Sequence, residues 1–316
     1  MAYHFTPAHK QGRFFYDFLG PRLRTRGLTS DRIRERTFQP PEHREQPRLV
    51  ICADDFGFSQ AISQSIVTLA QRGKLNAISC MSVCPGWEND APLLRTLPAS
   101  IQIGLHLTLT DEAPLTGMPQ LAWDGRMPSC NELGRRALMR RLPLGELREE
   151  IAAQFDRFVD VFGRAPDFVD GHQHVHVLRG IREIILAETA RRAPGAWIRN
   201  CSDRPAAMLA RHFPLKAVAN AAQSRGLREA AAAFGLRCND SFAGLYDFTT
   251  DYAALFPSFL DQPGAFHLVI CHPGGGNRPA DGIAQARRLE AAALRRMPIH
   301  EMAAARGFSF EAVAPM

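Results

Sequence analysis

The sequence predicts an α/β fold in which one barrel-like domain occupies residues 48–316. Short apolar runs alternate along this stretch with amphipathic segments, which is the pattern of β/α units. The run Leu49–Ala53 contains no polar residue, as expected for a parallel strand that is buried on both faces. No repeat period and no second apolar core divides the stretch, so a single domain is expected.

Short apolar runs that end at Gly, Pro or charged residues are assigned as strands. The expected strands cover residues 49–53, 76–83, 101–108, 167–171, 197–199, 241–244, 266–271 and 308–313.

Residues 144–162 form the strongest expected helix, because Leu147, Ile151 and Phe155 recur four residues apart. Residues 109–143 contain several prolines and are expected to be a long loop, which in a compact domain is usually functional or mobile. The other expected helices cover residues 61–70, 91–97, 181–191, 205–236, 252–260, 283–296 and 299–306.

The basic charge is concentrated in residues 1–47, which carry nine Lys or Arg against five Asp or Glu. This segment lacks periodicity and ends near Pro40-Pro41, so we expect a flexible or loosely docked extension. Its aromatic run Phe14–Leu19 permits at most a peripheral membrane contact. The rest of the chain lacks a basic stripe, which argues against nucleic-acid binding.

Composition and cysteine usage suggest a cytoplasmic protein. Hydrophobic residues make up 46% and charged residues 22% of the chain, and no run of 18 apolar residues is present. The seven cysteines are an odd number without paired spacing, and Cys52 and Cys271 fall in expected core strands. Free thiols in a reducing compartment are therefore expected.

Two neighbouring carboxylates, Asp54 and Asp55, follow the first strand. The carboxyl ends of parallel strands are where α/β folds place their chemistry. Because side chains alternate along a strand, one carboxylate can bind a cation while the other handles a proton. The competing interpretation is an ordinary helix cap, for which Asp is also favoured.

Several histidines fall at the ends of expected strands, where they would share one rim with the two carboxylates. Of the 11 histidines, those at strand ends are His106, His172, His174, His176 and His272. A carboxylate with two or more imidazoles is a ligand set for a catalytic divalent ion. Spacing does not decide between His172, His174 and His176, and a His-x-His pair would instead suggest an amidohydrolase-type barrel.

Four ordered motifs make the chain similar to a known family from about Arg48 onward. They are Ala53-Asp54-Asp55-Phe56-Gly57, Gly104-Leu105-His106, Asp170-Gly171-His172-Gln173-His174-Val175-His176 and Cys271-His272-Pro273-Gly274. In these motifs the sequence resembles the YdjC-like carbohydrate deacetylases, the group that contains chitooligosaccharide deacetylase and hopanoid-associated deacetylase. The resemblance implies a distorted β/α barrel related to polysaccharide deacetylases.

The resemblance also implies roles for individual residues. Asp55, His106 and His172 match the ligands of one divalent ion, Zn²⁺ or Mg²⁺. Asp54 matches the general base and His272 the acid that protonates the leaving amine. Three further residues would contact the substrate or support these groups. His174 would do either, Asp170 would support a ligand, and Arg199 would orient a carboxylate.

The activity implied is hydrolytic removal of acetyl from an N-acetylated amino sugar, carried by an oligosaccharide or a lipid-linked glycoside. The alternative from another class is a sugar-binding or regulatory protein that keeps the fold without catalysis. Release of acetate would separate the two. Whether the chain forms a homodimer is left open by the sequence.

Overall fold

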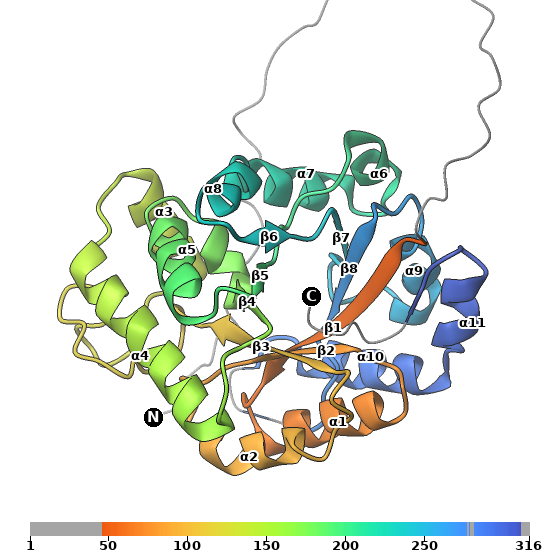
Figure 1. The fold of residues 1–316 in the computed structure, drawn as a ribbon, viewed down its shortest axis with the longest axis horizontal. Coiled ribbons are helices and arrows are strands. Elements are labelled where there is room, and N and C mark those ends of the chain that lie inside the picture. The colour runs from red at the N-terminus through yellow and green to blue at the C-terminus, as the bar shows by residue number, and fades with distance from the viewer. Residues whose placement is uncertain (1–45, 277, 279–280, 311–316) are drawn as a thin grey trace, which may run out of the picture. The chain divides into compact units, whose positions relative to one another are not determined.

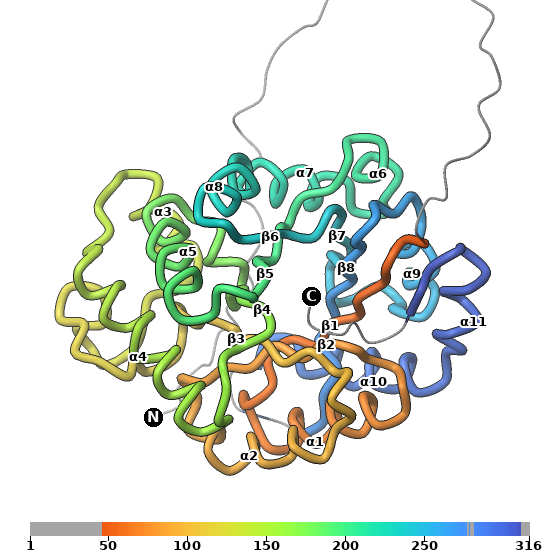
Figure 2. Tube along the Cα trace, viewed as in Figure 1, coloured from red at the N-terminus to blue at the C-terminus, as the bar shows by residue number. Residues whose placement is uncertain are grey.

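Parallel strands form one sheet that curves into an open barrel (Figures 1 and 2). The structure is a computed structural model, and it describes residues 46–276, 278 and 281–310. In chain order the strands are β1 (Arg48–Phe56), β2 (Ala77–Cys80), β3 (Gln102–Leu107), β4 (Phe168–Gly171), β5 (Trp197–Ile198), β6 (Arg237–Cys238), β7 (Ser241–Ala243) and β8 (Phe266–Cys271).

The strand order is β6-β5-β4-β3-β2-β1-β8-β7, so β6 and β7 are the two edges of the sheet. Asn239 lies between these edge strands in sequence. Its side-chain oxygen accepts from the Asn200 N–H at 2.7 Å, and its amide donates to the carbonyls of Asn200 and Ser241 at 2.8 and 3.0 Å. This side chain thus bridges the side where strand pairing is interrupted. The curved parallel sheet with its surrounding helices confirms the predicted distorted β/α barrel.

Helices surround the sheet (Figure 1). They are α1 (Gln60–Gln71), α2 (Trp87–Leu94), α3 (Cys130–Leu138), α4 (Leu144–Phe162), α5 (Ile181–Arg192), α6 (Pro205–Ala210), α7 (Pro214–Gln223), α8 (Leu227–Ala233), α9 (Tyr252–Phe259), α10 (Ala284–Arg296), α11 (Ile299–Ala304) and the 3₁₀ segment η1 (His172–Val177). Among the described residues, no helix combines the length and apolar character that a bilayer crossing needs.

Strand β1 is central because it pairs with both β2 and β8. Leu49, Val50 and Ile51 are at most 1% exposed, which confirms the prediction of a strand buried on both faces. Helix α4 packs Ile151 and Phe155 into the same core. The carboxyl ends of β1, β3, β4 and β8 therefore meet on one rim, as parallel pairing requires.

The stretch 109–143 was expected to be a loop-rich segment without a helix of its own, but α3 lies within it. Ser129 caps this helix by accepting from the Glu132 N–H at 3.4 Å. Ser129 and Glu132 form the Ser-x-x-Glu pattern of a capping box, so the start of this helix had a signal in the sequence. Further upstream, the backbone N–H groups of Leu115 and Thr116 both donate to the buried Glu150 carboxylate on α4 at 2.9 Å, so this part of the loop is held in place.

Other boundaries also differ from the expectation. Helix α2 begins at Trp87 rather than at residue 91, and the short strand β6 was not predicted. The helical stretch 205–236 consists of α6, α7 and α8, two of which start at a proline. Of the last expected strand, only Ser309 makes a β-bridge, to Arg48, and residues 311–313 are outside the described part.

All seven cysteines are free thiols, as expected. Cys52 and Cys271 are buried in neighbouring strands, and the Cys271 thiol lies 3.4 Å from the Cys52 carbonyl oxygen. Burial raises the pKa of both thiols well above its usual value. The predicted N-terminal extension, residues 1–47, lies outside the described residues except for Gln46 and Pro47.

Candidate active site

The turn at the end of β1 separates the two neighbouring carboxylates. Asp55 has φ 69° and Gly57 has φ 90°, and the pairing register of β1 shifts between Ala53 and Phe56. The Gly57 N–H donates to Ser63 Oγ at 3.0 Å. Positive φ is rare for a residue with a side chain and commonly occurs at functional sites. The side chains of Asp54 and Asp55 thus point in different directions as predicted, but the cause is this irregular turn rather than the alternation of a regular strand.

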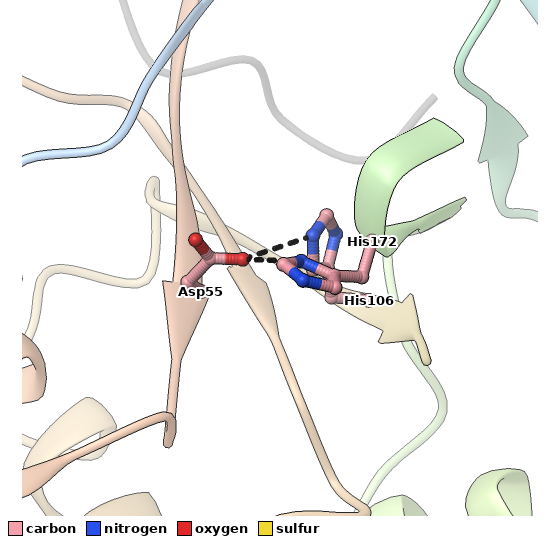
Figure 3. Close-up of side chains that lie close together, drawn as sticks. All are labelled: Asp55, His106 and His172. Carbon is pink, nitrogen blue, oxygen red and sulfur yellow. Dashed lines mark hydrogen bonds and ion pairs between the residues drawn. The ribbon is translucent and has the colours of Figure 1, made fainter. Parts of the chain in front are cut away.

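Asp55 meets His106 and His172 on the rim (Figure 3). Its Oδ1 lies 3.3 Å from His106 Nε2 and 2.9 Å from His172 Nδ1. One ligand atom from each of the three residues lies within 4.8 Å of the others. The residues come from the ends of β1 and β3 and from the start of η1, so the sequence prediction that they converge is confirmed.

His106 is oriented from behind by Asp170, which the parallel register of β3 and β4 places beside it. Its Nδ1 lies 2.6 Å from Asp170 Oδ1, and Ser79 Oγ donates to the same carboxylate oxygen at 2.5 Å. A carboxylate behind a metal-binding imidazole fixes the ring and leaves the other nitrogen available. Burial lowers the pKa of His106, but the charges of Asp170 and Asp54 outweigh it and raise this pKa to about 10.

The second oxygen of Asp55 is held by Arg287 from α10. Arg287 Nη2 donates to Asp55 Oδ2 at 2.7 Å, and its Nε donates to Asp281 at 2.9 Å. Burial raises the pKa of Asp55, while the charges of Arg287 and His172 outweigh it and hold this pKa well below its usual value. Sequence reasoning missed Arg287, because nothing in an arginine-rich helix distinguishes it from its neighbours.

The donor set of Asp55, His106 and His172 fits a divalent ion. One carboxylate oxygen and two imidazole nitrogens are neutral or anionic donors of the kind that Zn²⁺ binds in catalytic sites. Asp170 occupies Nδ1 of His106, and Arg287 occupies Oδ2 of Asp55. The atoms that can face an ion are therefore Nε2 of His106 and Oδ1 of Asp55. The group therefore has both the ligands and the supporting contacts of a metal site.

Asp54 does not face this group and instead forms an ion pair with the fully buried Arg199. Both carboxylate oxygens accept from the guanidinium at 2.6 Å, and Arg199 also contacts Asp170. Burial raises the pKa of Asp54, but the charge and hydrogen bonds of Arg199 outweigh it, and the net effect is a pKa well below its usual value. Asp54 is therefore ionised across the ordinary pH range.

A second group of metal-ligating atoms, formed by Cys52, Asp54 and Asp170, is not a good metal site. The Arg199 guanidinium contacts all three residues, with Nη2 3.4 Å from Cys52 Sγ. A permanently positive group thus occupies the place where a cation would be needed.

His272 follows β8 and lies close to Asp54. Its Nε2 is 3.9 Å from Asp54 Oδ2, and its ring lies edge-on to Phe248 with centroids 5.4 Å apart. Burial lowers the pKa of His272 to about 4, so the ring is neutral at neutral pH. Among the described residues, its Nδ1 has no hydrogen-bond partner.

His174 and His176 do not join the candidate ligands. His174 Nδ1 lies 3.5 Å from Cys201 Sγ, and His176 Nε2 donates to the Arg199 carbonyl at 2.9 Å. In a strand, residues two apart would face the same side, but η1 is a 3₁₀ segment in which Gln173 and His174 have positive φ. This geometry gives no support to a chelating His-x-His pair.

Comparisons with known proteins point to one family and one fold. The sequence model of the family described as YdjC-like protein matches residues 48–311. Chitooligosaccharide deacetylase of Proteus mirabilis (strain HI4320) is 37% identical over 137 residues, which are 43% of this chain and 53% of that protein. Chitooligosaccharide deacetylase of Enterobacter sp. (strain 638) is 35% identical over 144 residues, 46% of this chain and 56% of that protein. The chain thus spans about half the length of the curated relatives it matches.

A solved structure shares the fold. A candidate cellobiose-phosphate cleavage protein of Enterococcus faecalis V583 superposes with a TM-score of 0.66 at 21% identity, covering 84% of this chain and 96% of that one. At this identity the likeness shows the fold alone.

Proposed function

The chain belongs to the YdjC-like protein family, and on that premise we propose that it hydrolyses the acetyl group from an N-acetylated amino sugar with the help of a divalent ion. The observation that carries this proposal is the division between the two carboxylates. Asp55 faces two imidazoles, whereas Asp54 lies outside that group and next to His272. The relatives named chitooligosaccharide deacetylase support the substrate class.

In this proposal Asp55, His106 and His172 hold the ion, which is Zn²⁺ or Mg²⁺. When bound, such an ion polarises an amide carbonyl and lowers the pKa of water. Asp170 keeps His106 in the required orientation through its 2.6 Å contact with Nδ1. Arg287 leaves Asp55 with one free oxygen, so coordination positions remain for substrate and water.

Asp54 is the proposed acceptor of the proton that the attacking water gives up. Its low pKa keeps it ionised, and the two hydrogen bonds from Arg199 orient it. The departing nitrogen must gain a proton before it can leave readily. His272 is the proposed donor, and because its ring is neutral at rest it must first receive a proton. Asp54 Oδ2, 3.9 Å from His272 Nε2, is placed to supply it.

His174 is proposed to contact the substrate. It is only partly buried, and its Nδ1 faces Cys201 rather than the candidate ligands. Burial lowers the pKa of His174 well below its usual value, so it would act as a neutral hydrogen-bonding group.

The substrate is proposed to be a chitooligosaccharide or another N-acetylated saccharide, with a lipid-linked glycoside as the remaining member of the class. The cytoplasmic location and, at most, a peripheral membrane contact through residues 1–47 stay predictions from the sequence, and a homodimer stays open.

The test is release of acetate from a panel of N-acetylglucosamine compounds, including oligosaccharides and a lipid-linked glycoside. The full chain is assayed after chelator treatment and again after addition of Zn²⁺ or Mg²⁺. We expect acetate release that depends on the added ion. Binding of these sugars without acetate release under any metal condition would instead support the sugar-binding alternative.

A further inference from the structure

Helix α10 supports both halves of the candidate site. Arg287 and Glu290 are three residues apart, so they lie on the same face of the helix. Arg287 holds Asp55 of the candidate metal group, and Glu290 accepts a hydrogen bond from the backbone N–H of His272. Glu290 was not identified from the sequence, and its side chain is fully buried.

Both oxygens of Glu290 have a specific partner. Oε2 accepts from the His272 N–H, and Oε1 accepts from the Tyr246 hydroxyl at 2.6 Å. Neither donor carries a formal charge, and burial raises the pKa of Glu290 to about 7. Burying a carboxyl group costs free energy because the group loses its hydration, whereas an apolar side chain could fill the same space without that cost. The burial of Glu290 therefore indicates a specific role for its two hydrogen bonds.

The segment that carries His272 is fixed to α10 at both ends. The His272 N–H is bound to Glu290, Pro273 has a constrained φ, and the Gly274 N–H donates to the Arg287 carbonyl at 3.1 Å. A Cβ atom at Gly274 would lie 2.8 Å from Ile62, so the backbone also packs closely there. These contacts fix the backbone from which the His272 side chain projects, and Nδ1 of the ring has no hydrogen-bond partner among the described residues.

We propose that Glu290 is a positioning residue that holds the His272 imidazole beside Asp54 by accepting the His272 backbone hydrogen bond. The inference deepens the proposed function, because it depends on His272 acting in the reaction. Tyr246 orients the Glu290 carboxylate from its other oxygen. Through α10, the position of the proposed acid is tied to the helix that also carries Arg287.

Two conservative substitutions separate positioning from charge. Glu290→Gln removes the charge but keeps the length, and its amide oxygen can accept from His272 while its amide N–H donates to the rotated Tyr246 hydroxyl. Glu290→Asp keeps the charge but is one methylene shorter, so it cannot reach both donors. Positioning therefore predicts that Gln is the milder change, whereas a purely electrostatic role predicts that Asp is milder.

The full chain with metal supplied is assayed for kcat, KM and metal affinity. We expect Glu290→Gln to keep most of its kcat and Glu290→Asp to lose roughly 10–100-fold in kcat, since a displaced reacting group has an effect of that size. KM and metal affinity should change little in either variant. An Asp variant as active as the natural chain, or a Gln variant more impaired than Asp, would overturn the proposal.

The matched control is Ser241→Ala. It removes another buried hydrogen bond, the 2.6 Å contact between Ser241 Oγ and His267 Nδ1 at the other end of β8. This variant should lower the melting temperature without the loss of kcat expected of Glu290→Asp. An equal loss of kcat in Ser241→Ala would show that general destabilisation explains the effect, and the proposal would then be wrong.

An NMR measurement tests the positioning without any turnover. The ring signals of His272 are assigned in ¹⁵N-histidine-labelled protein as those missing from a His272→Gln variant. We expect them to move in Glu290→Asp and to stay near their original positions in Glu290→Gln and Ser241→Ala. If no substrate releases acetate, the proposed function fails while this measurement still decides the role of Glu290. Unmoved His272 signals in Glu290→Asp would reject that role.

Discussion

Arg287 donates from Nη2 to Oδ2 of Asp55 at 2.7 Å, so only Oδ1 of this carboxylate faces His106 and His172. A carboxylate restrained in this way offers a single oxygen to a cation rather than two. With two imidazole nitrogens it supplies three donors, which leaves further coordination positions open for water and substrate. The contact therefore links a residue far along the chain to the coordination that the proposed chemistry needs.

The two neighbouring carboxylates should respond differently to substitution. Asp54→Asn is expected to keep metal binding and to lose about 10²–10⁴-fold in kcat, the usual effect of removing a general base. Asp55→Asn is expected to weaken metal binding, so that excess ion restores part of its activity. Metal content and acetate release are measured for both. Equal defects that are rescued by metal in both variants would mean that the two residues share a ligand role.

Metal binding should release a proton from His106. Its pKa of about 10 means that the apo protein carries this proton near neutral pH, and a bound ion must displace it. Calorimetric titrations in buffers of different ionisation enthalpy measure the protons released. The release should decrease in Asp170→Asn, which removes a charge that raises this pKa, and also as the pH approaches the pKa of His106. Ser79→Ala, which removes a hydrogen bond but no charge, is the control, and an Asp170→Asn variant with undiminished release would contradict the prediction.

Glu290 should make stability depend on pH near neutrality. Its pKa is about 7 in the folded chain against an ordinary value of 4.5, so between these values the folded state binds more protons than the unfolded state. Stability from this group therefore falls as pH rises between these two pKa values, by roughly 3 kcal/mol. A glutamine side chain does not titrate. The free energy of unfolding of Glu290→Gln should therefore rise relative to that of the natural chain as the pH increases between these two pKa values. A difference that is constant with pH would contradict the assignment.

Gly104 in the Gly104-Leu105-His106 motif should tolerate no side chain. A Cβ atom there would lie 2.3 Å from Cε2 of Phe168 on the neighbouring strand. Gly104→Ala is expected to destabilise the fold by about 1–3 kcal/mol, as overpacking usually does. Gly134→Ala, in helix α3 with open space around it, should be neutral or stabilising. The melting temperatures of the two variants are compared. Equal values would contradict the prediction that Phe168 leaves no room for a side chain at residue 104.

Residues 1–45 should be dispensable for turnover of a small N-acetylated sugar. All candidate site residues lie at or beyond Asp54. Just before β1, the Pro47 carbonyl accepts from the Ser309 N–H at 2.9 Å, and a chain that begins at Gln46 keeps this contact. A chain that begins at Gln46 should therefore keep its kcat on a water-soluble substrate. If it folds, as judged by its melting transition, but loses activity, the removed segment contributes to the site.

Much of the fold could be read from the sequence because burial on two faces leaves a local pattern. The apolar run in β1, the four-residue spacing in α4 and the apolar stretch of β8 all depend on residues close together in the chain. Helix α3 was missed although its Ser129–Glu132 cap was present, because the surrounding prolines suggested a loop. The strand β6 has two residues, too few for a period to be visible.

The sequence by itself determined which residues approach one rim, since the ends of parallel strands must meet. Asp54, Asp55 and His106 lie in the last residues of such strands, and His172 and His272 lie directly after them. Only the tertiary structure decided how they are divided. The irregular turn at Asp55 and the 3₁₀ segment at His172 set side-chain directions that no strand period predicts. Arg287 and Glu290 lie on a helix without any local signal, because their role depends on a distant carboxylate or backbone group that only folding brings within hydrogen-bonding distance. Arg199 was a candidate from the sequence, but its contacts with Asp54 and Asp170 are set by the fold.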